Sequence, residues 1–148
     1  MYADYEYYVG TYLGDLLTSD NAAKWLDRAS DELDARTFGR LQTSFPVDDY
    51  SIKRVKNATC AVAESLYQRD LAMRSSAASV SQDGTVNPPV KSLSSGKESI
   101  SYADGFQQVS SGAYRAVIGS ILTDSLAGAV DANGVSLLYA GREANRVR

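Results

Sequence analysis

Apolar and polar positions follow a helical period along the first half of the chain. Between Ala22 and Leu33 the apolar residues recur three or four positions apart, and acidic and basic residues fill the positions between them. This spacing gathers the apolar side chains on one face of an amphipathic helix, and Trp25 widens that buried stripe. Because glycine often follows the last turn of a helix, we expect this helix to end near Phe38 and Gly39.

A longer helix is predicted to follow. Pro46 marks a break, because the residue before a proline is pushed out of the helical region. After Asp48 or Asp49, either of which can cap a first turn, the chain runs to about Arg74 without Gly or Pro. The apolar face of this predicted helix comprises Ile52, Val55, Thr59, Val62 and Leu66.

Two shorter helices are predicted towards the ends of the chain. Residues 2–13 form an aromatic segment that predicts a helix closed by Gly14. A last helix begins with Ser110 or Ser111 as its cap, and Gly119 in its middle predicts a close packing contact. The apolar face of the last helix comprises Tyr114, Val117, Ile118, Ile121, Leu122 and Leu126.

The remaining segments lack this periodicity. Residues 75–96 are rich in Ser, Ala, Gly, Asn and Pro, so we expect a mobile loop or an arm that becomes ordered on a partner. Residues 97–102 alternate around Ile100 and predict one short strand. After a turn at residues 131–134 comes an apolar run, followed by an arginine-bearing end. Such a segment is expected either to fold back on the bundle or to dock on another molecule.

These elements predict a single, mainly α-helical domain over residues 1–148. Its fold class is a small bundle of about four helices, with a long polar loop that contains a short β-strand or hairpin and with an extended C-terminal arm. The helical core covers residues 1–74 and 110–130, the loop covers 75–109 and the arm covers 131–148. The acidic, aromatic N-terminus lacks the features of a signal peptide, so we expect a soluble chain made in the cytosol.

Composition narrows the chemistry available to one chain. There is no histidine and only one cysteine, Cys60. This excludes an intrachain disulfide, a His/Cys zinc site, haem on an axial histidine, and Ser-His-Asp or Cys-His nucleophile pairs within a single chain. The formal net charge of −3 argues against a protein whose main task is to grip nucleic-acid phosphates. We expect no catalytic, cofactor or metal site, and we expect Cys60 to be a small buried hydrophobe.

Two charged clusters are better explained by solvation than by ligand binding. Asp27, Asp31 and Asp34 are spaced along one side of a helix rather than around one point, which favours a solvated face over a cation site. A basic cluster at the start of the long helix is too small to favour nucleic-acid contact over a solvated face. This cluster comprises Lys53, Arg54 and Lys56.

Tyrosine is concentrated at the N-terminus, with five of the ten tyrosines in the first twelve residues. Tyr5, Tyr8 and Tyr12 are three and four positions apart, which predicts packing of one face on the bundle. Tyr7 is expected on the opposite side. Tyrosine is also enriched at protein interfaces, so packing and partner binding are equally favoured here.

Several short motifs follow one another along the chain. They include Tyr2-Ala3-Asp4-Tyr5-x-x-Tyr8, Thr37-Phe38-Gly39-Arg40, Val55-Lys56-x-Ala58-Thr59-Cys60, Glu98-Ser99-Ile100-Ser101-Tyr102 and Leu137-Leu138-Tyr139-Ala140-Gly141. Their order resembles that of the head-completion, or head-to-tail adaptor, proteins of tailed bacteriophages. The resemblance covers nearly the whole chain, and its specificity lies in the succession of the motifs, because each one is short.

The resemblance implies a non-enzymatic virion structural protein of the neck, made in the host cytoplasm. About a dozen copies would form a ring on the portal protein, extend the channel through which double-stranded DNA passes without specific binding, and receive the next neck (stopper) or tail protein. The portal-docking arm it implies comprises Leu137, Leu138, Tyr139, Arg142 and Arg146. The subunit or tail interface it implies comprises Ile100, Tyr102 and Phe106. A small helical DNA-binding or regulatory domain is the first alternative, and a carboxylate-dependent enzyme or metal-binding helical protein is the second.

Overall fold

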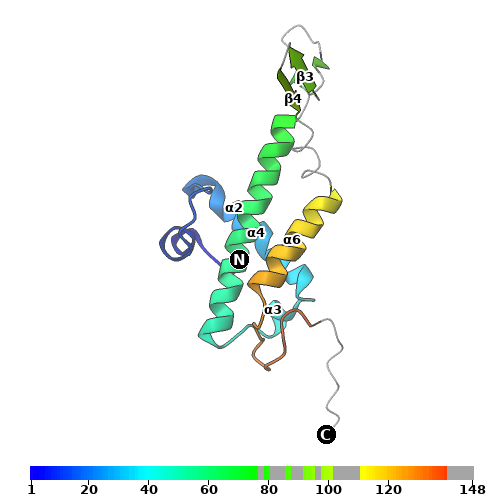
Figure 1. Cartoon of the computed structure of the whole chain (residues 1–148). Helices are drawn as coiled ribbons and strands as arrows, with labels where there is room; N and C mark the ends of the chain where they lie inside the picture. The colour runs from blue at the N-terminus through cyan, green and yellow to red at the C-terminus, as the bar shows by residue number, and fades with distance from the viewer. Residues whose placement is uncertain (77–78, 81–85, 88–91, 96–97, 102–110, 140–148) are drawn as a thin grey trace.

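One long helix, α4 (Asp49–Ser76), runs through the bundle of the computed structural model, and α2 (Ser19–Arg36) and α6 (Ser111–Ser125) pack against it (Figure 1). The structure describes residues 1–76, 79–80, 86–87, 92–95, 98–101 and 111–139, with side chains for residues 1–74 and 112–139. The prediction of a mainly helical fold is confirmed. No described helix is both long enough and apolar enough to cross a membrane.

Helix α2 ends close to its predicted limit near Phe38 and Gly39. At its start, the Thr18 backbone N–H donates a hydrogen bond to Oδ1 of Asn21 at 3.0 Å. This bond satisfies one of the backbone N–H groups that have no partner within the helix. The helix stops because Phe38 and Gly39 both take left-handed conformations, with φ of 56° and 72°. Its buried face comprises Ala22, Trp25, Leu26, Ala29, Ser30 and Leu33.

Helix α4 confirms the predicted long helix. Oδ2 of Asp48 accepts a hydrogen bond from the Ser51 backbone N–H at 2.7 Å and so caps the first turn. Cys60 is fully buried, and this burial, helped by Glu64, raises the pKa of its thiol to about 12. Cys60 is therefore the inert buried hydrophobe that its neighbours predicted. The residues buried along α4 are Ser51, Val55, Ala58, Thr59, Cys60, Val62 and Ala63.

The predicted helix over residues 2–13 is wrong in its extent. The segment is a single α-helical turn, α1 (Tyr5–Tyr7), followed by a π-helical turn, η1 (Tyr8–Tyr12). Leu13, not Gly14, takes the left-handed position, with φ of 63°. Gly14 is needed for another reason: a Cβ atom there would lie 2.1 Å from Cζ of Tyr8.

Tyr8 fixes this N-terminal segment to α4. Its side chain is fully buried, and its hydroxyl donates to Oε1 of Glu64 at 2.7 Å. The same hydroxyl accepts the backbone N–H groups of Leu16 and Leu17 at 3.0 and 3.2 Å. The Tyr12 hydroxyl donates to Oε2 of Glu64 at 3.4 Å. The Glu64 carboxylate and the Tyr8 hydroxyl thus connect α4, the N-terminal turns and the segment at Leu16 and Leu17.

Tyr7 also packs on the bundle, so its predicted place on the opposite side is wrong. Its hydroxyl donates to Oδ1 of Asn57 at 2.8 Å, and Nζ of Lys56 lies 4.9 Å from the centre of its ring. A helical period does not apply across the junction of the two short turns, and neighbouring tyrosines can therefore both reach α4.

Helix α6 lies on α4 through a narrower face than predicted. Tyr114, Ile118 and Leu122 are buried, but Val117 is 45% exposed. The predicted close contact at Gly119 is also wrong. A Cβ atom there would meet only Nη1 of Arg36, at the ordinary distance of 3.8 Å. Among the described residues, α4 covers one row of side chains on α6, and Val117 lies outside that row.

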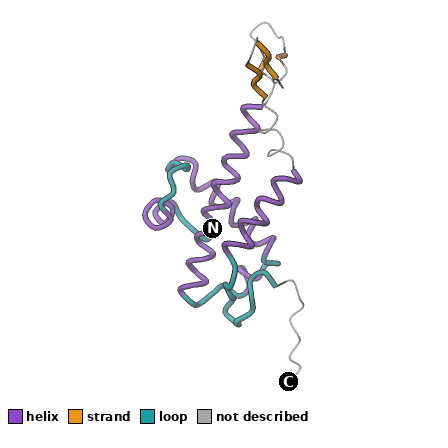
Figure 2. Tube along the Cα trace, in the orientation of Figure 1, coloured by secondary structure: helices purple, strands orange, loops and turns teal. Residues whose placement is uncertain are grey.

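Beyond the C-terminal end of α4, the described backbone forms short antiparallel pairs (Figure 2). Strand β1 (Ser79–Val80) pairs with β2 (Val86–Asn87), and β3 (Ser92–Ser95) pairs with β4 (Glu98–Ser101). In the second pair Ile100 lies opposite Leu93. The predicted mobility of this region stays a prediction.

Replacing Tyr8 with Phe tests the hydroxyl network. The Tyr8→Phe chain should lose about 2 kcal/mol of its free energy of unfolding, because two buried backbone N–H groups and the Glu64 carboxylate lose a partner. Urea denaturation measures this loss. Tyr5→Phe is the matched control, since Tyr5 is partly exposed and stacks on Tyr8 at 6.4 Å between ring centroids. Equal stability of the two variants would contradict the network.

The same network predicts a loss of stability at high pH. Burial and Glu64 raise the pKa of Tyr8 and of Tyr12 from 10.0 to about 12. Between these values a tyrosine of the unfolded chain releases its proton while the folded one keeps it, which favours unfolding. The stabilisation should be fully present below pH 10 and fall as the pH rises to about 12. Urea denaturation at stepped pH should show a shallower fall for the Tyr8→Phe/Tyr12→Phe chain; an unchanged fall would contradict the assignment.

Candidate functional site

The segment after α6 folds back on the bundle through a tight turn. Oδ1 of Asp131 accepts the backbone N–H groups of Asn133 and Val135 at 2.8 and 2.9 Å. Val130 and Ser136 form an antiparallel bridge. As a result, Leu137 enters the core and is fully buried.

Arg40 then fixes the end of this segment to α3 (Arg40–Thr43). Its Nη1 lies 3.6 Å from Oδ2 of Asp131, whose side chain is only 1% exposed. Its Nη2 donates to the backbone carbonyl of Tyr139 at 3.3 Å, and the guanidinium lies 5.9 Å from the centre of the Tyr139 ring. A buried carboxylate needs such a partner. Arg40 therefore holds Tyr139, the last residue of this segment that the structure describes.

Large apolar side chains are exposed around this point. Val47 is 75% exposed and Phe38 is 64% exposed, and Phe38 is held in a left-handed conformation that bulky residues rarely take. In Figure 1 the segments that carry them lie at the end of the molecule that also holds α3 and the start of α4. We call this set the basal surface: it comprises Phe38, Val47, Tyr50 and Tyr139.

The structure separates the residues that the resemblance assigned to portal docking. Leu137 is a core residue, so its assignment as a docking contact is wrong for the folded chain. The alternative expectation, that this segment folds back on the bundle, applies to Leu137. Leu138 packs partly on the core, and Tyr139 is exposed on the basal surface. Arg142 and Arg146 lie outside the described residues.

The loop residues assigned to subunit or tail contacts are only partly described. Ile100 lies in β4, where the structure gives the backbone alone. Tyr102 and Phe106 lie outside the described residues.

The basic cluster at the start of α4 does not form an open face. Nε of Arg54 donates to the Tyr50 hydroxyl at 3.2 Å and its Nη2 to the Ala127 carbonyl at 3.4 Å. Lys56 lies over the Tyr7 ring, which leaves Lys53 as the exposed member of the cluster. Two of the three side chains therefore have structural partners within the chain.

Asp34 and Asp27 of α2 each contact a different group within the chain. Asp34 accepts hydrogen bonds from the Tyr2 hydroxyl and, at 2.8 Å, from Nε2 of Gln42. Asp27 lies 3.8 Å from the N-terminal amine. Within the described part of the chain, no group of three or more Asp, Glu or Cys side chains is arranged to hold a metal ion.

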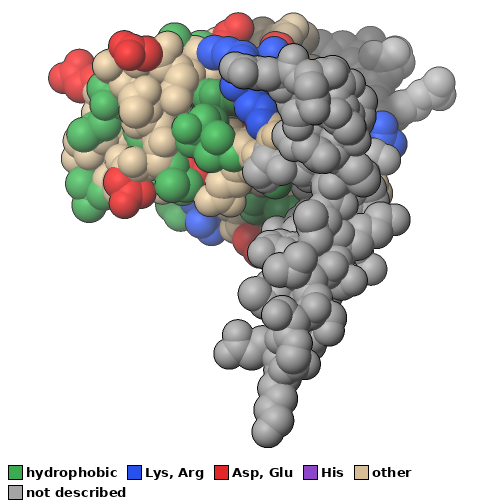
Figure 3. All heavy atoms as spheres, turned by 90° about the horizontal axis from the view of Figure 1, so that it is seen from above, with side chains coloured by type: hydrophobic (Ala, Val, Ile, Leu, Met, Phe, Trp, Pro, Cys, Tyr) green, Lys and Arg blue, Asp and Glu red, His purple; other side chains and the backbone are tan. Residues whose placement is uncertain are grey.

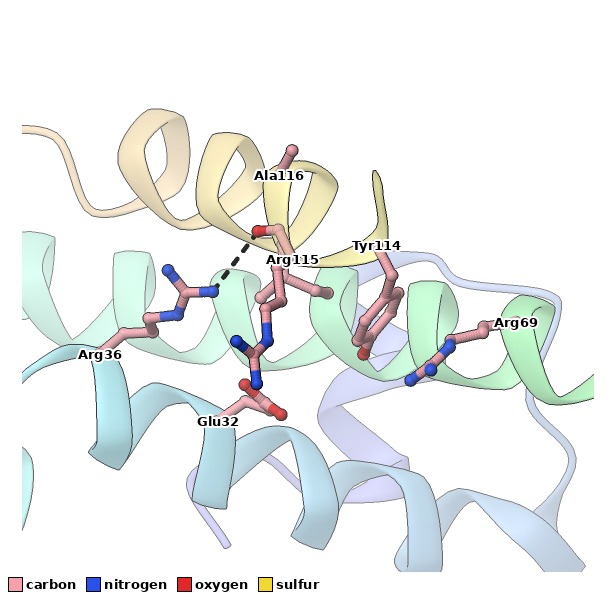
Figure 4. Close-up of a pocket in the computed structure, with 7 residues that line it drawn as sticks. Glu32, Arg36, Arg69, Tyr114, Arg115 and Ala116 are labelled. Atoms are coloured by element: carbon pink, nitrogen blue, oxygen red, sulfur yellow. Dashed lines mark hydrogen bonds between the residues drawn. The ribbon is translucent and has the colours of Figure 1, made fainter. Parts of the chain in front are cut away.

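A second candidate site is a cleft of about 720 Å³ between α2, α4 and α6 (Figure 4). Arg36 reaches it from α2, Arg69 from α4 and Arg115 from α6, and Glu32 is the acidic side chain among the described residues that line it. We call it the arginine cleft. Its remaining lining comprises Tyr114, Ala116 and Ile118.

Sequence reasoning missed both surfaces. Arg40 and Asp131 are 91 positions apart in the sequence, and the three arginines of the cleft come from three different helices. The one local signal is the Thr37-Phe38-Gly39-Arg40 motif, which places an aromatic residue and a cation directly after a helix end.

Comparison with protein-family models, with curated proteins and with solved structures finds no match. The class that the geometry defines is a small helical bundle with two candidate interaction surfaces, the basal surface and the arginine cleft.

A double-mutant cycle tests the ion pair under the basal surface. Arg40→Leu should lower the free energy of unfolding by about 3 kcal/mol, because it leaves the Asp131 carboxylate buried without its cation. Asp131→Asn should cost less, since the amide oxygen can still accept from Asn133 and Val135. The double variant should be more stable than Arg40→Leu alone in urea denaturation at neutral pH. Simple addition of the two losses would show that the pair is not coupled.

Proposed function

We propose that this chain is a non-enzymatic virion structural protein, a head-to-tail adaptor of a tailed bacteriophage. Its copies would form a ring on the portal protein, extend the DNA channel and receive the next neck or tail protein. The basal surface, together with residues 140–148, which follow Tyr139 in the sequence, would make the portal contact. Tyr139, Arg142 and Arg146 are the arm residues we assign to that contact.

The arrangement around Arg40 is the observation that carries this proposal. Two motifs of the resemblance, Thr37-Phe38-Gly39-Arg40 and Leu137-Leu138-Tyr139-Ala140-Gly141, are far apart in the sequence. Arg40 of the first contacts Tyr139 of the second. The contact lies among exposed apolar side chains, and a surface of this kind is typical of a protein-binding site.

The N-terminal tyrosines do not add to this support, because the hydroxyls of Tyr7, Tyr8 and Tyr12 bond within the chain. The first alternative, a DNA-binding or regulatory domain with Lys53, Arg54 and Lys56 as its reader, receives less support. Arg54 and Lys56 would have to leave their contacts within the chain in order to reach a phosphate.

Binding to the portal protein of the same virus tests the proposal. Deletion of residues 140–148, and separately Phe38→Ala, should each weaken cosedimentation with portal rings by about tenfold or more, because each removes part of the contact. Leu71→Ala is the control, since Leu71 is exposed on α4 away from the basal surface and should leave binding unchanged. Full binding by both basal variants would reject the assigned surface.

A gel shift with duplex DNA at low salt tests the rival function. The adaptor proposal predicts no discrete complex. A complex that is lost in a Lys53→Glu/Arg54→Glu chain, together with no portal binding by the wild type, would instead identify a DNA-binding domain.

A further inference from the structure

The arginine cleft holds polar groups that its own residues leave unsatisfied. The Tyr114 hydroxyl and Nε of Arg69 are buried, and neither has a hydrogen-bond partner within the described part of the chain. The guanidinium of Arg69 lies 4.1 Å from the centre of the Tyr114 ring. Buried groups of this kind ordinarily have a partner. Both atoms are closed to solvent, so a group from outside the chain reaches the exposed guanidinium of Arg115 rather than the space between them.

The charge of the cleft specifies an anionic partner. Among the described residues that line the cleft, three arginines and one glutamate give a net charge of +2, within a chain whose net charge is −3. Figure 4 shows Glu32 and Arg115 pointing towards each other, with Tyr114 between Arg115 and Arg69. Burial and Glu32 raise the pKa of Tyr114, against the smaller opposing effects of Arg69 and Arg36. The guanidinium donors of the cleft suit a carboxylate.

The other side of the molecule carries the complementary groups. Leu13 is 77% exposed, and it holds a left-handed backbone conformation that costs free energy in a bulky residue. Val9 and Leu16 are exposed beside it, and Glu6 and Asp15 are exposed within the same segment. We call these five residues the N-terminal edge.

The two surfaces face in different directions. The N-terminal turns and α6 lie on opposite sides of α4 (Figure 1). Seen from above, acidic and hydrophobic side chains intermix at the left end of the visible face, and Lys and Arg gather towards its middle (Figure 3). A contact between unlike surfaces on opposite sides of one chain is head-to-tail, and repeated copies then form a ring or a filament.

We propose that the arginine cleft binds a carboxylate of the N-terminal edge of a second copy of this chain. Apolar side chains of that edge would cover the exposed face of α6, where Val117 is open, while its acidic groups enter the cleft. The contact itself is a property of this chain alone. Only its closure into a ring rests on the proposed adaptor function.

Complementation between two variants tests this contact. Arg115→Glu alters the cleft at an exposed position, and Leu13→Gly/Asp15→Lys alters the edge while supplying the residue best suited to the left-handed conformation. By analytical ultracentrifugation, the wild type should self-associate with rising concentration, and each variant should associate at least about tenfold more weakly. An equimolar mixture of the two variants should form a dimer, because one intact cleft then meets one intact edge.

Two matched control variants change a charge outside the arginine cleft and the N-terminal edge. Arg74→Glu removes an exposed arginine that pairs with Asp70, and Asp124→Lys removes an exposed acid of α6. Both should associate like the wild type, and all variants should keep the helical circular dichroism of the wild type.

Several results would overturn the contact. They are a wild type that stays monomeric up to millimolar concentration, variants that associate normally, or a mixture that stays monomeric. Duplex DNA binding that Arg115→Glu abolishes without changing association would assign the cleft to phosphate instead. Loss of portal binding with intact self-association would reject the adaptor function alone, so the two failures are distinguishable.

Discussion

The need to cover α4 on several sides determines where α2, α6 and the N-terminal turns lie. Its buried positions are mostly small, with Ala58, Cys60 and Ala63 among them, so neighbouring backbones can approach closely. The apolar stripe of α2 covers one side, the face of α6 that holds Ile118 covers another, and the N-terminal tyrosines cover a third. Burial of this kind contributes most of the stability of such a bundle.

Polar contacts then fix segments that have little periodicity of their own. Glu64 holds the N-terminal turns through Tyr8, and Arg40 holds the C-terminal turn through Asp131. Both contacts involve buried groups, for which the loss of a partner is costly. The N-terminal edge and the basal surface lie next to these two contacts. Each exposed edge is therefore presented by a rigid support, which reduces the entropic cost of binding a partner.

The sequence predicts the three main helices because their signals are local. Apolar spacing, the cap at Asp48 and the left-handed residues after α2 act within a few positions, and Cys60 is recognisable from its neighbours. The N-terminal turns and the buried position of Leu137 depend on side chains elsewhere in the chain. Tyr8 finds Glu64 56 positions away, and Arg40 finds the carbonyl of Tyr139 99 positions away. No period within a short window encodes such contacts, so the candidate surfaces emerge only when the chain is folded.

The central claim is that the basal surface seats this chain on a portal ring. Electron microscopy of the portal protein mixed with the full chain tests it most directly. The account predicts an added ring of density on one end of the portal, with the bundle oriented so that α3 and Tyr139 face the portal. Portal rings without added density, or bundles attached through α6 with the basal surface turned outward, would contradict it.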